Sequence, residues 1–280
     1  MTTISFAQET LTHWHQAMAM ATGGKVFTTH ECSWAWQPAR GRLVLLFPLH
    51  AKASGIRPGL AEGARLGARR VEAWVNSGAP ADALNDSGFT DAAQISWHAG
   101  ELLSPIEFWE GRVRLDSDIP EASGADAKEL QVANLWRDPS RAGLSAGHSA
   151  LRRVEHATAR TLEGDLVGRA FAQQALGGQL AIHGLAVGAA HRRQGVGSAL
   201  LHGLARGMVN PLGLDEQSHI ELIAAASPTS AEFFLANGMR LLGRGRHMIL
   251  RKFFFHHVAV FLDAFPVALH DGARQGRHQC

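Results

Sequence analysis

The stretch that decides the fold reads Leu185-Ala186-Val187-Gly188-Ala189-Ala190-His191-Arg192-Arg193-Gln194-Gly195-Val196-Gly197-Ser198. It begins as an apolar strand end, continues as a short basic turn, and runs into an amphipathic helix predicted from Ser198 to Arg206. Backbone N–H groups at such a turn and helix start lack intrahelical acceptors, so they form an anion site that suits a pyrophosphate. Gly195 and Gly197 have no Cβ, which allows phosphates to approach the backbone closely.

This loop has neither of the two common nucleotide-loop signatures, because no Lys-Ser/Thr follows the glycines and no G-x-G-x-x-G follows the strand. A second apolar strand is predicted at 219–226, followed by a short helix at 230–237. In this context the order Arg-x-x-Gly-x-Gly after Leu-Ala-Val resembles the acetyl-CoA pyrophosphate loop of the GNAT acetyltransferase superfamily.

The segment after the second strand extends the resemblance, which covers residues 150–252. In the superfamily this segment usually reads Asn-x-x-Ala-x-x-Phe-Tyr-x-x-x-Gly-Phe. The corresponding residues here are Ser227, Ser230, Phe233, Phe234, Gly238 and Met239. The chain therefore departs from the pattern at the asparagine and at the tyrosine, and it contains no tyrosine at all.

Composition favours a soluble globular protein, with 46% apolar and 19% charged residues among 280. A net charge of +2 and the lack of a dense basic run argue against a nucleic-acid partner. No apolar run reaches the ~20 residues that span a bilayer, and no signal peptide is visible at the start. We therefore expect a cytoplasmic protein with no membrane partner, as a monomer or homodimer.

Metal chemistry is not expected. The two cysteines, Cys32 and Cys280, lack metal-ligand spacing and fit a reducing cytosol. The 16 histidines are scattered, and no His-Glu-x-x-His occurs.

The first half of the chain repeats the order of elements in the second. Strands are predicted at 42–48, 71–75 and 93–97, separated by helix-like segments, and the second of these segments ends in Gly88-Phe89. The same order of strand, helix, strand, helix, strand is predicted over 180–251. We therefore predict an α/β fold with two GNAT-like units, each a mixed, mostly antiparallel sheet flanked by helices.

The first copy lacks the glycine loop. The corresponding residues run from Ala51 to Pro58, contain no glycine pair, and include a proline that removes a backbone donor. This arrangement resembles tandem GNAT proteins with one degenerate half. We predict a degenerate domain at 1–103, an acetyl-CoA-binding domain at 104–252, and a tail at 253–280 to which no site is assigned.

Two further helices are predicted in the second domain, at 127–136 and at 149–159.

The resemblance implies how the cofactor is held. The backbone of Leu185, Ala186 and Val187, on a strand that splays from its neighbour, would bind the pantetheine arm and the acetyl oxygen. The pyrophosphate would be bound by Arg192, Arg193, Gln194, Gly195, Val196, Gly197 and Ser198. Ser227 would hydrogen-bond the cofactor, and Phe234 would lie beside it.

Two residues are candidates for the catalytic base. His183 lies two residues before Leu185, so period two predicts His183, Leu185 and Val187 on one strand face, and its ordinary pKa suits proton removal. The strand resembles that of arylalkylamine acetyltransferases, in which two histidines relay the proton, but Ala181 replaces the partner. A histidine packed in the core is an equal alternative. Glu221 is the second candidate base.

The usual general acid is the tyrosine that Phe234 replaces. The thiolate would then leave unassisted, or water or another group would protonate it; a thiol pKa near ~8.5 makes unassisted departure tolerable. The resemblance as a whole implies an acetyl-CoA-dependent N-acetyltransferase acting on a small-molecule amine, whereas Ser227, Phe234 and the missing histidine partner favour a module without turnover. A non-catalytic acyl-CoA-binding module and a protein N-acetyltransferase remain alternatives.

Overall fold

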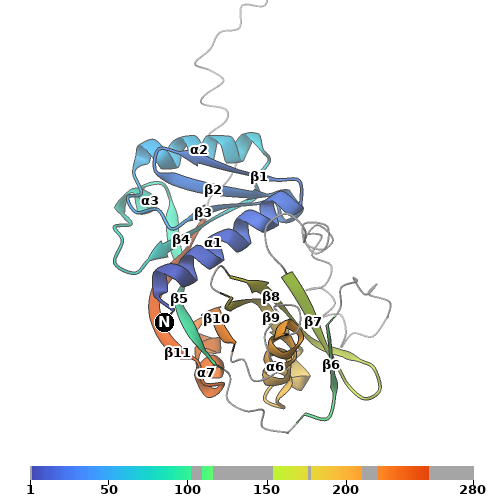
Figure 1. The fold of residues 1–280 in the computed structure, drawn as a ribbon. Coiled ribbons are helices and arrows are strands. Elements are labelled where there is room, and N and C mark those ends of the chain that lie inside the picture. Colours follow the sequence, from blue (N-terminus) through green and yellow to red (C-terminus); the bar gives the residue numbers. More distant parts are fainter. Residues whose placement is uncertain (1, 102–108, 116–153, 176–177, 210–219, 252–280) are drawn as a thin grey trace, which may run out of the picture.

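The computed structural model describes residues 2–101, 109–115, 154–175, 178–209 and 220–251. Their strands form one mixed sheet in the order β1-β2-β3-β4-β11-β5-β10-β9-β8-β7-β6, with helices on both faces (Figure 1). The predicted α/β architecture, with a mixed and mostly antiparallel sheet flanked by helices, is confirmed. The two predicted units do not form two sheets, because the described strands are continuous across the molecule.

The first half, residues 2–101, supplies two long helices and five strands. Its elements are α1 (Ile4–Ala21), β1 (Lys25–Thr29), β2 (Cys32–Gln37), η1 (Pro38–Arg40), β3 (Arg42–Leu46), α2 (Ala53–Arg65), β4 (Arg70–Asn76), α3 (Asp82–Asp86) and β5 (Phe89–Glu101). The three strands predicted here from apolar runs are present as β3, β4 and β5.

The second half, the described residues from 109 to 251, contains the predicted glycine loop. Its elements are β6 (Arg112–Leu115), β7 (Val154–Arg160), β8 (Leu166–Gln174), β9 (Leu180–Val187), η2 (Ala189–His191), α6 (Val196–Val209), β10 (Glu221–Ala226), α7 (Pro228–Ala236) and β11 (Arg240–Leu250). The strands expected on either side of the loop helix are present as β9 and β10.

One of the two further helices predicted in the second half is wrong. Residues 154–159 lie in β7, which pairs antiparallel with β8 and buries Ala157 and Ala159. Alanine-rich segments favour helix locally, but pairing with a neighbouring strand decided the outcome here. The helix expected at 127–136 and the tail at 253–280 lie outside the described residues.

The strand order has the same pattern on both sides of its centre. The parallel pair β3/β4 is joined through α2, and the parallel pair β9/β10 is joined through α6. The last strand of each half pairs within the other half: β11 lies between β4 and β5, and β5 lies between β11 and β10. This reciprocal exchange joins the halves into one sheet.

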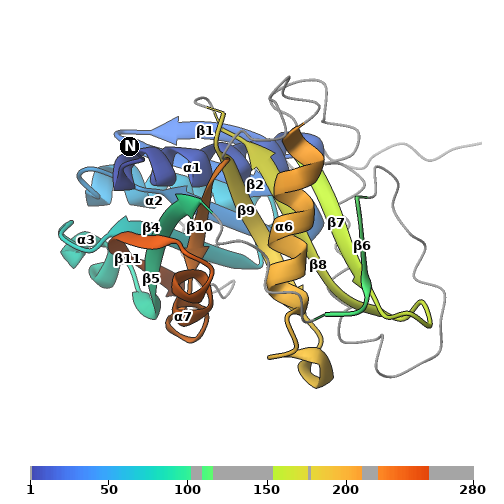
Figure 2. The same ribbon diagram turned by 60° about the horizontal axis from the view of Figure 1, so that its bottom comes forward.

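The two faces of the sheet are covered by different helices. Helix α1 crosses one face and contacts strands of both halves, namely β1, β2, β9 and β10 (Figure 1). The opposite face is covered by α2 and α3 in the first half and by α6 and α7 in the second (Figure 2). We call these the α1 face and the α6 face. No helix in the described ranges is long and apolar enough to cross a membrane.

Candidate active site

The strands β9 and β10 diverge at their carboxyl ends. They pair in parallel from Leu180–Leu222 to Ile182–Ala224 and no further. Beyond this point β10 continues along β5 to Ala226, while residues 183–187 of β9 continue along β8. The inner edge of β9 therefore presents backbone groups that β10 does not bond, as the resemblance implied.

A β-bulge in β9 reverses the face of the sheet toward which the side chains after Gly184 point. Gly184 has φ +58°, and the β8–β9 register shifts between Arg169 and Phe171. Leu185 and Val187 pack against the core cluster under α6. The expectation that His183 shares their face is wrong, because the extra residue breaks the period of two and leaves His183 on the α1 face.

The basic turn after β9 contains two residues with left-handed backbone conformation. Arg193 and Gly195 have φ values of 63° and 84°. In the first turn of α6, Ala199 N–H donates to the Gly195 carbonyl at 2.9 Å. The N–H groups of the preceding helix residues, 196–198, therefore have no intrahelical acceptor. Arg192 is held by a 3.2 Å bond from Nε to the Val187 carbonyl.

Gly197 lies close to a side chain of α7. A Cβ at this position would lie 2.9 Å from Cε2 of Phe233, so the Phe233 ring would have to shift. The start of α6 therefore lies against the middle of α7, which follows the carboxyl end of β10. Ser227 immediately precedes α7, and its hydroxyl lies 2.9 Å from the Thr229 hydroxyl. The structure thus gathers the predicted loop and Ser227 near one end of the sheet.

His183 is enclosed by aromatic rings. Its imidazole stacks on Trp14 of α1 at 4.1 Å between ring centroids, with 9° between the planes. Burial lowers the pKa of His183 to about 3, and its Nε2 has no hydrogen-bond partner. The ring is therefore neutral near pH 7 and has a nitrogen available to accept a proton or a hydrogen bond.

Glu221, the other candidate base, lies away from the divergence. It is the first residue of β10, three residues before Ala224, so about 10 Å of strand separates it from the point where β9 departs. The Thr2 hydroxyl donates to its carboxylate, and Arg240 lies 3.8 Å away. These contacts support a role in anchoring the start of the chain to β10.

Phe234 lies in the core, with 4% of its surface exposed. Its ring lies 5.9 Å from that of His98 on β5 and 5.1 Å from that of Phe233. His98 Nε2 in turn lies 2.9 Å from the Ser96 hydroxyl. The hydroxyl that a tyrosine would supply is absent, and the aromatic packing is retained.

The first half contains no counterpart of this divergence. The strands β3 and β4 pair from Arg42–Arg70 to Leu46–Trp74, and Phe47 N–H donates to the Trp74 carbonyl beyond the end of β3. The segment after β3 enters α2 without a glycine loop, and Pro58 lies inside that helix. At the end of β9 the backbone groups have no partner on β10, whereas at the end of β3 the corresponding groups are hydrogen-bonded to β4.

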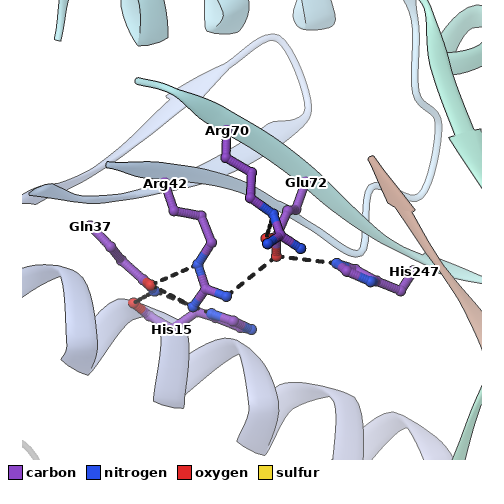
Figure 3. Close-up of polar contacts among 6 residues, drawn as sticks. All are labelled: His15, Gln37, Arg42, Arg70, Glu72 and His247. Atoms are coloured by element: carbon purple, nitrogen blue, oxygen red, sulfur yellow. Dashed lines mark hydrogen bonds and ion pairs between the residues drawn. The ribbon is translucent and has the colours of Figure 1, made fainter. Parts of the chain in front are cut away.

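The α1 face of the first half is closed by a polar network (Figure 3). The buried carboxylate of Glu72 lies 3.3 Å from Arg42 Nη1, 3.1 Å from His247 Nε2 and 2.5 Å from Arg70 Nε. Burial would raise the pKa of Glu72, but the hydrogen bond from His247 and the positive charges of Arg42 and Arg70 hold it below its ordinary value.

The network continues to helix α1. Arg42 donates from Nη2 to Gln37 Oε1 at 2.6 Å, and Gln37 Nε2 donates to the His15 carbonyl at 3.1 Å. Burial, reinforced by Arg42 and His183, keeps the pKa of His15 well below its ordinary value. The network thus ties α1 to four strands and leaves its arginines partnered (Figure 3).

Several residues beside the divergence carry no sequence signal that could have identified them. Trp14 belongs to an amphipathic helix far away in the chain, and Arg169 and Phe171 lie in strand β8. Their position depends on the register of β8 and on where α1 crosses the sheet. Within the described ranges, no group of three or more His, Cys, Asp or Glu side chains could hold a metal ion.

Comparison with known proteins finds a family model that matches part of the chain. Residues 129–234 match the model of the Acetyltransferase (GNAT) family. A comparison with curated proteins found no match.

Solved structures share the fold over most of the chain. A GCN5-related N-acetyltransferase from Kribbella flavida superposes with a TM-score of 0.55 at 16% identity, covering 91% of this chain and 98% of that one. A functionally unknown conserved protein from Staphylococcus epidermidis superposes with a TM-score of 0.55 at 14% identity, covering 82% and 94%.

A third structure is described as a tandem GNAT protein from the clavulanic acid biosynthesis pathway. It superposes with a TM-score of 0.52 at 12% identity, covering 78% of this chain and 77% of that one. At such identities the likeness establishes the fold alone. Together with the family match over residues 129–234, it shows that this chain is similar to GNAT acetyltransferases in part of its sequence and in its fold.

Proposed function

We propose that this protein is an acetyl-CoA-dependent N-acetyltransferase that acts on a small-molecule amine. The observation that carries the proposal is the divergence of β9 from β10 beside the unbonded N–H groups that open α6. An unpaired strand edge suits the amide groups of a pantetheine arm, and a helix start suits its pyrophosphate. Residues 192–198 would bind the pyrophosphate, and the backbone of 185–187 and the hydroxyl of Ser227 would bind the rest.

In this proposal His183 accepts the proton. The amine nitrogen attacks the thioester carbonyl carbon, the carbon–sulfur bond breaks, and the proton lost by nitrogen passes to the neutral imidazole. The sulfur leaves as a thiolate and takes its proton from solvent, because Phe234 has no hydroxyl to donate. Desolvation of His183 disfavours the imidazolium, so a compensating charge near the ring would be needed during transfer.

The proposal assigns the two halves different tasks. Residues 1–103 and 104–252 would be two GNAT-like domains that exchange their last strands, and only the second would bind acetyl-CoA. The matching parallel pairs and the reciprocal placement of β5 and β11 support this division. The closed ladder between β3 and β4 argues against a second cofactor site.

Two measurements test the proposal together. Calorimetry with CoA should give one site per chain. Thiol release from acetyl-CoA should then require an amine, measured over aminoglycosides, arylalkylamines, amino acids and peptides, with hydrolysis in the absence of amine as the control. Turnover of peptides alone would favour a protein N-acetyltransferase.

The second candidate function is a non-catalytic acyl-CoA-binding module. Burial of Phe234 in place of the usual tyrosine is the observation that favours it. Tight CoA binding with no thiol release from any amine would establish this alternative and exclude the enzyme.

A further inference from the structure

Arg169 of β8 is a buried cation for which the described residues supply no carboxylate partner. Only 5% of the residue's surface is exposed, and its Nε has no hydrogen-bond acceptor. No carboxylate in the described ranges forms an ion pair with it, and its contact is with the Phe171 ring, 5.5 Å from the guanidinium carbon to the centroid. Burying an unpaired guanidinium is costly, so its retention calls for an explanation.

Arg42 of the first half, which is largely buried, shows how the same fold satisfies such a charge. It faces the carboxylate of Glu72 and the amide oxygen of Gln37, as Figure 3 shows. No carboxylate of the described residues faces Arg169 in this way. Burial lowers the pKa of Arg169 to about 10, which still leaves the guanidinium charged at neutral pH.

Arg169 lies beside the proposed base. Its register partner is Ala186, on the part of β9 that has left β10, and Phe171, two residues along, is the partner of His183. Trp14 lies 5.7 Å from the Phe171 ring and stacks on His183. One cation, one neutral imidazole and two aromatic rings therefore line the α1 face where β9 diverges.

The location excludes the cofactor phosphates as the partner of this charge. The glycine loop and the start of α6 belong to the opposite face of the sheet, where Val196 and Leu200 are part of the α6-face core. A purely cationic amine would be repelled from this place, whereas an anionic group would be bound.

We propose that Arg169 binds a carboxylate of the acceptor, so that the substrate is an amine that also carries a carboxylate. The guanidinium fork would bind both oxygens, and the amine would lie toward His183. The aromatic rings of Trp14 and Phe171 would cover the carbon skeleton between the two polar groups. This inference rests on the proposed function, because it assigns the acceptor of the same reaction.

The test uses matched acceptors that differ by one carboxylate. Acetylation is measured for phenylalanine against phenethylamine, and for p-aminobenzoate against aniline, with the full-length protein and saturating acetyl-CoA. The wild-type protein should prefer the acid of at least one pair. Arg169→Gln should raise the KM of that acid roughly 10- to 100-fold, the loss expected for a charge-assisted pair, and should change the matching amine less than about twofold.

Controls separate recognition from stability. Arg160→Gln removes another arginine of the same hairpin, whose Nη1 bonds the Gly164 carbonyl, and should leave the selectivity unchanged. Arg169→Lys keeps the charge without the fork and should give an intermediate KM for the acid. CoA affinity should be the same in all four proteins. Equal use of acid and amine by the wild type, or an equal loss for both in Arg169→Gln, overturns the inference.

A binding measurement distinguishes this inference from the proposed function. Calorimetry with 3-phenylpropionate, which has the carboxylate and no amine, should show binding to the wild type and a loss in Arg169→Gln. Binding without turnover of any amine would support the carboxylate site and overturn the transferase. Turnover of amines with no binding of the acid and no acid preference would support the transferase and overturn the carboxylate site.

Discussion

The two parallel strand pairs of the sheet are each joined through a helix in the same order, and they differ at their carboxyl ends. Between β3 and β4 the ladder continues to the end of β3 and one residue beyond, whereas between β9 and β10 it stops at Ile182–Ala224. The helix that follows β9 begins with a glycine loop, and the helix that follows β3 does not. The second half therefore has both an open strand edge and an unbonded helix start, the two features on which the proposed cofactor site depends.

The buried charges differ in the same way. In the first half Glu72 satisfies two arginines and a histidine, which turns the α1 face into a cross-link between sheet and helix. In the second half Arg169 and the His183 ring have buried nitrogens without partners. The carboxylate that pairs with Arg42 in the first half therefore has no counterpart beside Arg169 among the described residues of the second half.

The largest effect is expected from substitutions that block the proposed pyrophosphate-binding loop, residues 192–198. Gly197→Glu should weaken CoA binding at least about 100-fold, because the new Cβ meets Phe233 at 2.9 Å and the carboxylate repels phosphate. Ser198→Glu places the charge without that clash and should act in the same direction. The control is Gly78→Glu in the first half, where a Cβ meets nothing within 4 Å. Calorimetry that finds unchanged affinity in both loop variants would refute the cofactor site.

The next effect concerns the proton acceptor. His183→Ala should lower kcat by about 10²–10⁴-fold with CoA affinity nearly unchanged, which is the range for loss of a general base. Glu221→Gln should be close to wild type, since that carboxylate is bonded to Thr2. Thiol-release assays decide between the two residues. If Glu221→Gln is inactive and His183→Ala is not, His183 is only a packed residue.

In the first half, where the β3–β4 ladder is complete, we expect a substitution in the Glu72 network to change the stability of the protein and not its affinity for CoA. Glu72→Gln leaves Arg42 and Arg70 without their buried counter-charge and should lower the free energy of unfolding by about 3–5 kcal/mol. Glu31→Gln removes an exposed pair with Lys52 at 3.9 Å and should cost less than about 0.5 kcal/mol. Urea unfolding measures both. A clear loss of CoA affinity in folded Glu72→Gln would show that the halves are coupled at the site.

His183, in the second half, should make the folded protein less stable in mild acid. Because burial lowers the pKa of His183 to about 3, the unfolded chain takes up a proton near pH 6.5 while the folded chain does not. Stability therefore falls as the pH drops below about 6.5, by about 2 kcal/mol for this group between pH 7 and pH 5. His183→Gln should remove that share of the loss in urea midpoints, and an unchanged pH dependence in this variant would contradict the expectation.

The smallest effect is expected at the position of the missing acid. Phe234→Tyr should change kcat less than about threefold, because the thiolate leaves without help in the wild type. Phe234→Leu should keep turnover and lose up to about 1.5 kcal/mol of stability, the usual limit for swaps of similar volume. Steady-state kinetics measures kcat, and thermal melting measures the loss of stability. A large loss of kcat in folded Phe234→Leu would mean that this ring positions the reacting groups.

Some interpretations of the sequence needed only local information. The strand–loop–helix order around residues 185–198 follows from apolar runs, a glycine pair and helix periodicity, all within one short stretch, and the loop dihedrals agree with it. The repeated element order also follows from such runs. The helix predicted at 149–159 failed because its local preference was overridden by pairing with β8.

The sequence by itself determined that a strand, an anion-binding turn and a helix start occur in that order, because backbone geometry at a turn depends on neighbouring residues. Only the tertiary structure decided that β9 leaves β10 after Ile182, that a bulge at Gly184 turns His183 toward α1, and that β5 and β11 change places. The same holds for Glu221 lying away from the divergence and Arg169 lying beside it. These features depend on strand register and on contacts between residues far apart in the chain, where a shift of one residue moves a side chain to the other face.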